Sequence, residues 1–556
     1  MNVTVSDLVV KYMERLGIEV IFGMPGAHIL PVYDCLYDSS IRSVLAKHEQ
    51  GAAFMAGGYV RASGRIGACI TTAGPGATNL VTGIANAYAD KQPVLIITGE
   101  APTYIFGKGG LQESSGEGGT IDQVALFKGI TKYNKIVERT DYLENVLIQA
   151  SNILLGENPG PVLLSFPFNV QKEMVDDAIL NSIDFKHRIR PIHEGSEPVL
   201  ALTEMIAAAK NPVIIAGYGC IKANAQEQVR QLSERMGIAV TSSLKGKGVV
   251  SERSPYALGS LGVTSYGPAY QYIREKSDLV IVLGAAFNER TSYVWDKGLL
   301  KDKTIAQVDN DYSQLGKVFK PDVAIQGDIK IVLKGVLTNL ESRQVAKKDS
   351  MDVPSELVCM EQLAPESDAA IFKQRFALIE TLFEKMEQYV PGNVMVFDDN
   401  IIFAQNFFRV SNGSRYYPNS GVSSLGRAIP AAIGARFIED RPAMAILGDG
   451  GFQMCCMEIM TAVNYNIPLS IVMFNNSSMG LIRKNQSQQY RQRFINCDFS
   501  NPDYAMLAAS FGIEHRKIEN PAELDAVFSQ LDFVNAINLI EVMIEKDLFP
   551  TYTSRR

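Results

Sequence analysis

Short apolar runs alternate with longer segments of helical periodicity along most of the chain. The runs include VLIITG, PVLLSFP, PVIIAG, LVIVLG, AMAILG, LSIVMF and NLIEVMI. Apolar runs of this length, without polar alternation, are typical of strands that are buried on both faces of a parallel sheet. Strands that alternate with helices favour doubly wound α/β domains. We therefore expect an α/β fold built on parallel sheets.

Two stretches interrupt this alternation, because they lose periodicity and gain charged residues and proline. They cover about 172–192 and about 342–368, and we interpret both as linkers. The linkers divide the chain into three expected domains at residues 1–172, 192–341 and 368–556. The expected architecture is thus three doubly wound parallel-sheet domains in one chain.

The composition favours a globular protein that acts on small molecules. The chain has 556 residues, of which 46% are apolar, and a formal net charge of -7. Without a basic tract, neither nucleic acid nor an anionic membrane surface is expected as a partner. The seven cysteines are scattered and lack metal-ligand spacing, which favours a reducing, cytoplasmic location. No apolar run approaches the roughly 20 residues of a membrane-spanning helix.

Polar residues end two neighbouring apolar runs in the last third of the chain. Gly448, Asp449 and Gly450 close the run AMAIL, and Asn475 and Asn476 close LSIVMF. The segment between them has helical periodicity, so the unit is predicted to be strand, helix, strand. Because such crossovers give parallel neighbouring strands, Asp449 and Asn476 should meet at the carboxyl edge of one sheet.

This arrangement suits a divalent cation and phosphate groups. A carboxylate and an amide oxygen are ligands that Mg²⁺ accepts, and water and cofactor phosphates complete its octahedron. Gly450 and Gly451 would let a diphosphate approach the backbone at the start of the following helix. The alternative is a pair of ordinary turns, since Asp, Asn and Gly are common turn residues.

The spacing of these residues resembles the thiamine diphosphate fingerprint, which is Gly-Asp-Gly followed at a distance by Asn-Asn. Residues 451–474 separate the two parts here. In that fingerprint the Asp, the second Asn and a main-chain oxygen two residues later hold Mg²⁺. The resemblance implies that Asp449, Asn476 and the carbonyl of Ser478 are metal ligands, with Gly448, Gly450 and Gly451 beside the diphosphate.

Nearly the whole chain resembles the acetohydroxyacid synthase branch of the thiamine diphosphate enzymes. The shared motifs are FGMPGAHILPVYD, HEQGAAFMAGGYVRASG, TTAGPGATNL, NPGPVLLSFP and SLGRAIPAAIGA, together with the Gly-Asp-Gly-Gly and Asn-Asn pair. The resemblance implies a carboligase that decarboxylates a 2-oxo acid, pyruvate, and transfers the acyl unit to a second carbonyl acceptor. Two alternatives stay open: an aldehyde lyase or ligase like benzaldehyde lyase, without decarboxylation, and a non-catalytic cofactor-binding subunit.

The resemblance also assigns residues around the cofactor. Glu49 would activate the aminopyrimidine by favouring its imino form, although a Glu in the first turn of a helix is often only a partner of the helix dipole. Ser423 and Leu425 would offer main-chain groups to the pyrimidine. Leu425 would also wedge the cofactor into its bent shape, in place of the Met usual in the branch. Asn400 aligns with a diphosphate-binding position, with a strand-end turn as the alternative.

Departures from the branch fall on residues expected around the substrate. Ala27 and His28 follow Pro-Gly where the branch reads Pro-Gly-Gly and a small residue. Benzaldehyde lyase has a similar Gly-Ala-His-Ile run with the His in its active site, so His28 could relay protons. The alternative is a His that serves only as a structural hydrogen-bonding residue. Gln112 matches an active-site Gln that could donate to a substrate oxygen. Asn485 replaces a Trp that shapes the acceptor pocket, and Arg483 and Lys484 add charge nearby, which together favour a larger or more polar acceptor. The alternative for Arg483 and Lys484 is two solvated helix charges.

The resemblance bears on assembly and on a further cofactor as well. In the branch, the pyrimidine domain of one subunit faces the diphosphate domain of another, so Glu49 and Asp449 would meet across a homodimer, or within a homotetramer. The middle domain resembles the flavin-binding domain of the branch through AGYGC and GAAFNER, which makes FAD a candidate cofactor. The usual Arg is absent at Ala286, and non-flavin relatives keep the same fold, so FAD binding stays open.

Overall fold

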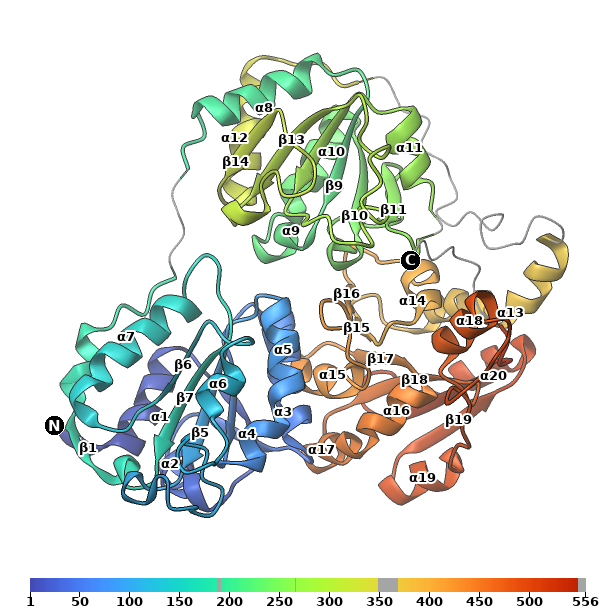
Figure 1. The fold of residues 1–556 in the computed structure, drawn as a ribbon. Coiled ribbons are helices and arrows are strands. Elements are labelled where there is room, and N and C mark those ends of the chain that lie inside the picture. The colour runs from blue at the N-terminus through green and yellow to red at the C-terminus, as the bar shows by residue number, and fades with distance from the viewer. Residues whose placement is uncertain (188–191, 266, 349–368, 549–556) are drawn as a thin grey trace.

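The structure, a computed structural model, describes residues 1–187, 192–265, 267–348 and 369–548 (Figure 1). Three of its sheets have six strands each, and all neighbouring strands in them run parallel. Helices cover the faces of these sheets. The α/β class with three doubly wound parallel sheets is therefore confirmed.

The N-terminal domain is built on the sheet β3-β2-β4-β5-β7-β6. Its strands are β2 Val20–Gly23, β3 Arg42–Leu45, β4 Gly67–Thr71, β5 Val94–Glu100, β6 Tyr133–Ile136 and β7 Val162–Pro167. Its helices are α1 Val5–Arg15, α2 Leu30–Tyr37, α3 Glu49–Ser63, α4 Pro75–Asn79, α5 Val81–Ala89, α6 Gln123–Phe127 and α7 Leu143–Leu154. A small antiparallel ladder joins β1 Asn2–Thr4 to β8 Met174–Asp176.

The stretch 172–192, expected to be a linker, begins as part of this domain. β8 lies within it, and Val175, Leu180 and Ile183 belong to the apolar core of the N-terminal domain. A three-residue strand with one buried side chain leaves no periodic signal in a sequence, which is why the pattern pointed to a linker. Most of the second expected linker, 349–368, lies outside the described residues. The boundaries at 172, 192, 341 and 368 stay predictions.

The middle domain is built on the sheet β11-β10-β9-β12-β13-β14. Its strands are β9 Pro212–Ala216, β10 Ala239–Ser243, β11 Ala257–Leu261, β12 Leu279–Leu283, β13 Thr304–Asp309 and β14 Val323–Gln326. Its helices are α8 Glu197–Ala208, α9 Tyr218–Lys222, α10 Gln226–Met236, α11 Ala269–Glu275 and α12 Ile329–Ser342. Counted along the chain, this strand order is 3-2-1-4-5-6, which is the order of dinucleotide-binding sheets.

The C-terminal domain is built on the sheet β16-β15-β17-β18-β20-β19. Its strands are β15 Met395–Asp398, β16 Arg415–Pro418, β17 Ala443–Gly448, β18 Leu469–Asn475, β19 Glu514–Ile518 and β20 Ile537–Met543. Its helices are α13 Ala369–Tyr389, α14 Ile402–Phe407, α15 Ala428–Arg436, α16 Asp449–Cys455, α17 Ile459–Asn464, α18 Gly480–Gln489, α19 Tyr504–Phe511 and α20 Leu524–Phe528. Counted along the chain, the N-terminal and C-terminal sheets share the order 2-1-3-4-6-5.

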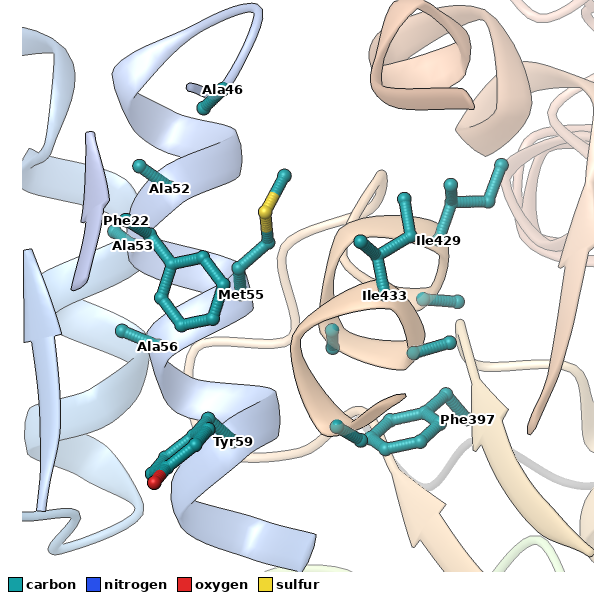
Figure 2. Close-up of a cluster of buried hydrophobic side chains, with 14 of the residues drawn as sticks. Phe22, Ala46, Ala52, Ala53, Met55, Ala56, Tyr59, Phe397, Ile429 and Ile433 are labelled. Atoms are coloured by element: carbon teal, nitrogen blue, oxygen red, sulfur yellow. The ribbon is translucent and has the colours of Figure 1, made fainter. Parts of the chain in front are cut away.

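Helices α3 and α15 join the N-terminal and C-terminal domains through one apolar core (Figure 2). Met55 of α3 and Ile429 and Ile433 of α15 lie in this core. A Cβ atom at Gly58 would lie 2.0 Å from the carbonyl oxygen of Ala431. Only glycine therefore lets the two helix backbones approach this closely.

The segment between β17 and β18 is not the single helix that its periodicity predicts. Helix α16 ends at Cys455, and a 3₁₀ turn, η9 Cys456–Glu458, precedes α17. Cys455 has φ -143° and ψ 2°, outside the helical range. Glu458, at the end of this break, contacts the N-terminal domain through the backbone of Lys47.

Candidate functional site

The structure brings the two predicted C-terminal turns together. Asp449 is the first residue of α16 and directly follows β17. β17 pairs in parallel with β18, with Gly448 opposite Phe474. Asn476 therefore lies beside Asp449, and its backbone N–H donates to the Asp449 carboxylate at 3.2 Å. The Asn476 side-chain oxygen accepts the N–H of Ser478 at 3.1 Å.

The Asp449 carboxylate is buried and held by several donors. One oxygen accepts the N–H of Gly450 at 2.9 Å. The other accepts the N–H of Ser477 at 2.6 Å and Nδ2 of Asn501 at 2.9 Å. Burial raises the pKa of Asp449 even though these hydrogen bonds oppose the shift. A cation at this carboxylate would favour its ionised form.

A cavity of about 320 Å³ opens at the same carboxyl edge. Its polar end is formed by Asp449, Gly450, Asn476 and Ser478, and its apolar walls include Ile401, Leu425, Leu481, Ile482 and Ile544. A Cβ atom at Gly450 would lie 2.7 Å from the sulfur of Met479, so a larger residue would fill the space at the helix start. The oxygen ligands and this glycine cradle fit a magnesium diphosphate group.

Asp399, which follows β15, fixes the loop that carries Leu425. Its carboxylate accepts the N–H of Gly426 at 2.6 Å and Nδ2 of Asn419 at 2.8 Å. Asn419 also donates to the carbonyl of Ser424 at 2.5 Å. Burial raises the pKa of Asp399 to about 7. Leu425 is thus held at the cavity wall by its neighbours on both sides.

Asn400 and Ser423 both adopt left-handed backbone conformations, with φ 66° and 57°. Nδ2 of Asn400 donates to the carbonyl of Ser423 at 3.4 Å. Asn400 lines the cavity, whereas Ser423 is not among the described residues that line it. The two predicted cofactor contacts are therefore neighbours in space.

Glu49 is the first residue of α3 and follows β3 at the carboxyl edge of the N-terminal sheet. Its side chain is buried, and one oxygen accepts Nδ2 of Asn79 at 2.9 Å. His48 caps the helix, since its Nδ1 accepts the N–H of Gln50 at 3.1 Å. Glu49 thus combines burial with a fixed hydrogen bond, as a functional carboxylate requires.

His28 and Gln112 lie together at the same edge of the N-terminal sheet. Nδ1 of His28 lies 3.3 Å from Oε1 of Gln112, and the hydroxyl of Thr72 donates to that oxygen at 3.3 Å. Gln112 has a left-handed φ of 58°. Both side chains are half-buried, and Ala27 beside His28 is exposed.

Arg483 and Asn485 lie on α18, and the guanidinium of Arg483 forms two ion pairs. Nη1 of Arg483 lies 2.7 Å from Asp498, and Nε lies 3.1 Å from Asp547. Asn485 is half-buried. The neighbouring Lys484 is fully buried, so the alternative of two solvated helix charges is wrong for it. Burial lowers the pKa of Lys484 to about 7.

Among the described residues, the predicted site residues of the N-terminal domain do not line the cavity at Asp449. Glu49, His28 and Gln112 all belong to the N-terminal domain, and none of them is among the described residues that line the cavity at Asp449. Over the described ranges, no group of three or more His, Cys, Asp and Glu side chains could hold a metal ion. A set of one carboxylate, one amide and one carbonyl oxygen is a different kind of ligand group, and one that suits Mg²⁺.

Comparison with known proteins identifies the family. Residues 3–126 match the thiamine pyrophosphate enzyme N-terminal TPP binding domain, residues 199–336 its central domain, and residues 399–541 its C-terminal TPP binding domain. The chain belongs to the thiamine pyrophosphate enzymes. Its N-terminal and C-terminal sheets are accordingly the two TPP binding domains of the family.

Relatives place the chain in the acetolactate synthase-like branch of these enzymes. It is 33% identical to a probable acetolactate synthase large subunit of Methanococcus aeolicus, over 94% of this chain and 89% of that protein. It is 31% identical to the acetolactate synthase large subunit of Lactococcus lactis subsp. lactis, over 97% and 92%. It is also 31% identical to the acetolactate synthase isozyme 1 large subunit of Escherichia coli, over 98% and 94%.

Two residues of this thiamine pyrophosphate enzyme escaped the sequence reasoning. Arg290, from the middle domain, lines the cavity at Asp449. It stands at the end of GAAFNER, a motif that drew attention only for a flavin. Asp399 lies next to Asn400. The acidic pair Asp398 and Asp399 at the end of a predicted strand could have indicated that Asp399 has a role in the site.

A second cavity, of about 660 Å³, lies at the carboxyl edge of the middle sheet, where α/β sheets bind ligands. It is lined by all three domains, including Tyr218, Asn310, Arg61 and Arg441. Its lining carries carboxylates, at Glu157, Asp328 and Glu439, as well as these cations. No helix in the described part of the chain is long and apolar enough to cross a membrane.

Proposed function

We propose that this protein is a thiamine diphosphate-dependent carboligase that decarboxylates a 2-oxo acid, pyruvate, and transfers the acyl unit to a second carbonyl compound. The observation that carries the proposal is the pair Asp449 and Asn476 at the ends of adjacent parallel strands, beside a cavity walled by Leu425. Relatives named acetolactate synthase favour this reaction over a benzaldehyde-lyase-like one without decarboxylation.

Mg²⁺ and the diphosphate would be held by the C-terminal domain. Asp449, Asn476 and the carbonyl of Ser478 would hold the cation, and Gly448, Gly450 and Gly451 would leave room for the phosphates at the start of α16. Once bound, the cofactor supplies the carbon nucleophile and the electron sink for decarboxylation. Leu425, fixed through Gly426 and Asp399, would press against its middle.

Glu49 would hold and exchange a proton at the cofactor's pyrimidine ring. Its burial and its bond from Asn79 fix the carboxylate in one orientation. Ser423 and Leu425 would direct main-chain groups to the same ring. These roles need Glu49 close to the cofactor beside Leu425, and Glu49 of the same chain does not line that cavity.

A second copy of the chain would complete the site. Asp449, Asn476 and Leu425 line the cavity, while Glu49, His28 and Gln112 lie elsewhere in the same chain. We therefore propose a homodimer in which Glu49 of one copy faces Asp449 of the other, with a homotetramer as the larger assembly. The described cysteines are free, which supports a reducing, cytoplasmic setting.

The acceptor would be oriented by polar groups from both domains. His28 and Gln112, which lie 3.3 Å apart, could donate to the acceptor oxygen as it gains negative charge. Ala27 leaves space beside His28, and Asn485 would shape the far wall. Because Arg483 is held in two ion pairs, its contribution would be to fix α18 rather than to bind the acceptor.

The test is CO₂ release from pyruvate by the purified chain with thiamine diphosphate and Mg²⁺, followed by mass analysis of products with aldehydes, ketones and acyl-thioesters. CO₂ release with a 2-hydroxy-2-acyl product is expected. Cleavage of acyloins without CO₂ release would instead support the lyase. No turnover of any substrate would support a non-catalytic subunit.

FAD is proposed as a candidate ligand of the 660 Å³ cavity. The visible absorbance of the purified protein tests this directly, since bound flavin is coloured. A colourless protein that binds no added FAD would contradict the proposal that FAD occupies this cavity.

A further inference from the structure

Glu458 of the C-terminal domain reaches across to the start of helix α3 in the N-terminal domain. Its Oε1 accepts the N–H of Lys47 at 3.1 Å and the N–H of His48 at 3.0 Å. Its Oε2 accepts the N–H of Lys47 at 3.2 Å. These two N–H groups directly precede Glu49 in the chain.

The Glu458 side chain is buried where the two domains meet. The side chain is only 3% exposed. The hydroxyl of Thr461 donates to Oε2 at 2.7 Å and fixes its rotation. A Cβ atom at Gly51 would lie 2.0 Å from Oε1, so glycine is required where α3 passes the carboxylate. The contact is therefore close-packed as well as hydrogen-bonded.

The same domain also holds the segment that leads into α3. The hydroxyl of Tyr465 accepts the N–H of Leu45 at 2.8 Å. The guanidinium of Arg42 lies over the ring of Phe437, 4.8 Å from its centre. Both ends of β3 and the two residues before α3 thus contact the C-terminal domain of their own chain.

We propose that Glu458 is a positioning residue for Glu49. N–H groups at a helix start need acceptors. By holding the two N–H groups before Glu49, Glu458 fixes where α3 begins and where its first side chain points. The inference rests on the proposed function of Glu49 at the cofactor's pyrimidine.

Two substitutions separate reach from charge. Glu458→Asp keeps the charge but withdraws the carboxylate by one methylene, so the contacts with Lys47 and His48 are lost. Glu458→Gln loses the charge but keeps an oxygen at the same reach. A positioning role predicts damage from Asp and tolerance of Gln, whereas a role through charge or proton transfer predicts the reverse.

The readout is the rate at which the thiazolium proton of bound thiamine diphosphate exchanges with deuterium, measured at saturating cofactor and Mg²⁺. Glu458→Asp should slow this exchange by about 10²-fold, the effect of misplacing a catalytic group by roughly 1 Å. Glu458→Gln should retain most of the rate. Asp503→Asn, which alters the cap of α19 in the same domain, is the matched control and should leave the rate unchanged.

Glu49→Gln separates failure of this inference from failure of the proposed function. If Glu49→Gln exchanges at the wild-type rate, the role of Glu49 is wrong and the inference falls with it. If proton exchange is slow in Glu49→Gln but as fast as wild type in Glu458→Asp, the proposed positioning role of Glu458 is wrong.

A folding defect is detected by the thermal midpoint of each variant. If Glu458→Asp does not fold, Thr461→Val replaces it, since it frees the rotation of Glu458 without touching α3. Slower exchange in a stable Thr461→Val protein supports the positioning role, and unchanged exchange overturns it.

Discussion

At the residue scale, two buried carboxylates at equivalent sheet edges have different surroundings. Asp449 is held by backbone N–H groups of α16 and of the residues after β18, which leaves it oriented toward the cavity. Glu49 is held by one side-chain amide, from Asn79. The orientation of the Asp449 carboxylate is therefore fixed by more hydrogen bonds than that of Glu49.

Asp449→Ala should abolish Mg²⁺-dependent binding of thiamine diphosphate, because the cation would bridge Asp449, Asn476 and the diphosphate. Calorimetric titration with the cofactor, with and without Mg²⁺, measures this. Asp503→Ala, at an exposed helix start of the same domain, is the control and should bind normally. Wild-type affinity in the Asp449 variant would rule out the metal assignment.

His28→Ala should slow ligation by about 10² to 10³-fold while changing CO₂ release less, by analogy with loss of an oxyanion-hole donor. Gln112→Ala should act in the same direction, since the two side chains are neighbours.

Asn485→Trp should shift products toward acetolactate and away from bulkier acceptors. Product ratios from pyruvate with competing acceptors measure all three, and Tyr37→Ala, at an exposed site, is the control. Unchanged ratios would refute the acceptor pocket.

At the element scale, close contact of α3 with α15 fixes one TPP binding domain against the other. Gly58→Ala should destabilise the protein by about 1–3 kcal/mol through overpacking, because the new Cβ would lie 2.0 Å from the Ala431 oxygen. Gly129→Ala, with open space around it, is the control. The urea unfolding midpoint measures both variants, and an equal midpoint for Gly58→Ala and wild type would contradict the packing.

The sequence predicted elements whose signal is local. The buried runs became strands, and the turns at Asp449 and Asn476 met because their strands are neighbours. The break at Cys455 was missed because the periodicity continues through it. The contact of Glu458 with Lys47 was missed because it joins residues 411 positions apart in the chain. Arg290 was missed for the same reason, because it enters the cavity from another domain.

At the scale of the whole molecule, a buried charge cluster joins the three domains. Asp90 of the N-terminal domain pairs with Arg61 at 2.5 Å and with Lys245 of the middle domain at 2.6 Å. Arg427 of the C-terminal domain adds a further positive charge, and burial lowers the pKa of its guanidinium to about 10. Burial would raise the pKa of Asp90, but the cations outweigh it and hold the pKa at about 2.

Asp90→Asn should destabilise the protein at neutral pH by about 3–5 kcal/mol, since it leaves buried cations without their carboxylate. The folded pKa of Asp90, about 2, lies below its ordinary value of 3.8. Its stabilising effect is therefore present above the ordinary value and is lost as the pH falls through about 2. Urea unfolding of both proteins across this range should show their difference shrinking with acid, and a constant difference would contradict the pairing.

The most direct test of the account is whether Glu49 and Asp449 complete one decarboxylating centre from two copies of the chain. Glu49→Gln and Asp449→Ala chains are each purified, co-assembled, and assayed for CO₂ release from pyruvate. Each variant alone should be inactive, and the heterodimer should regain activity because one of its centres then carries both intact residues. Verified heterodimers that release no CO₂ would contradict a shared centre.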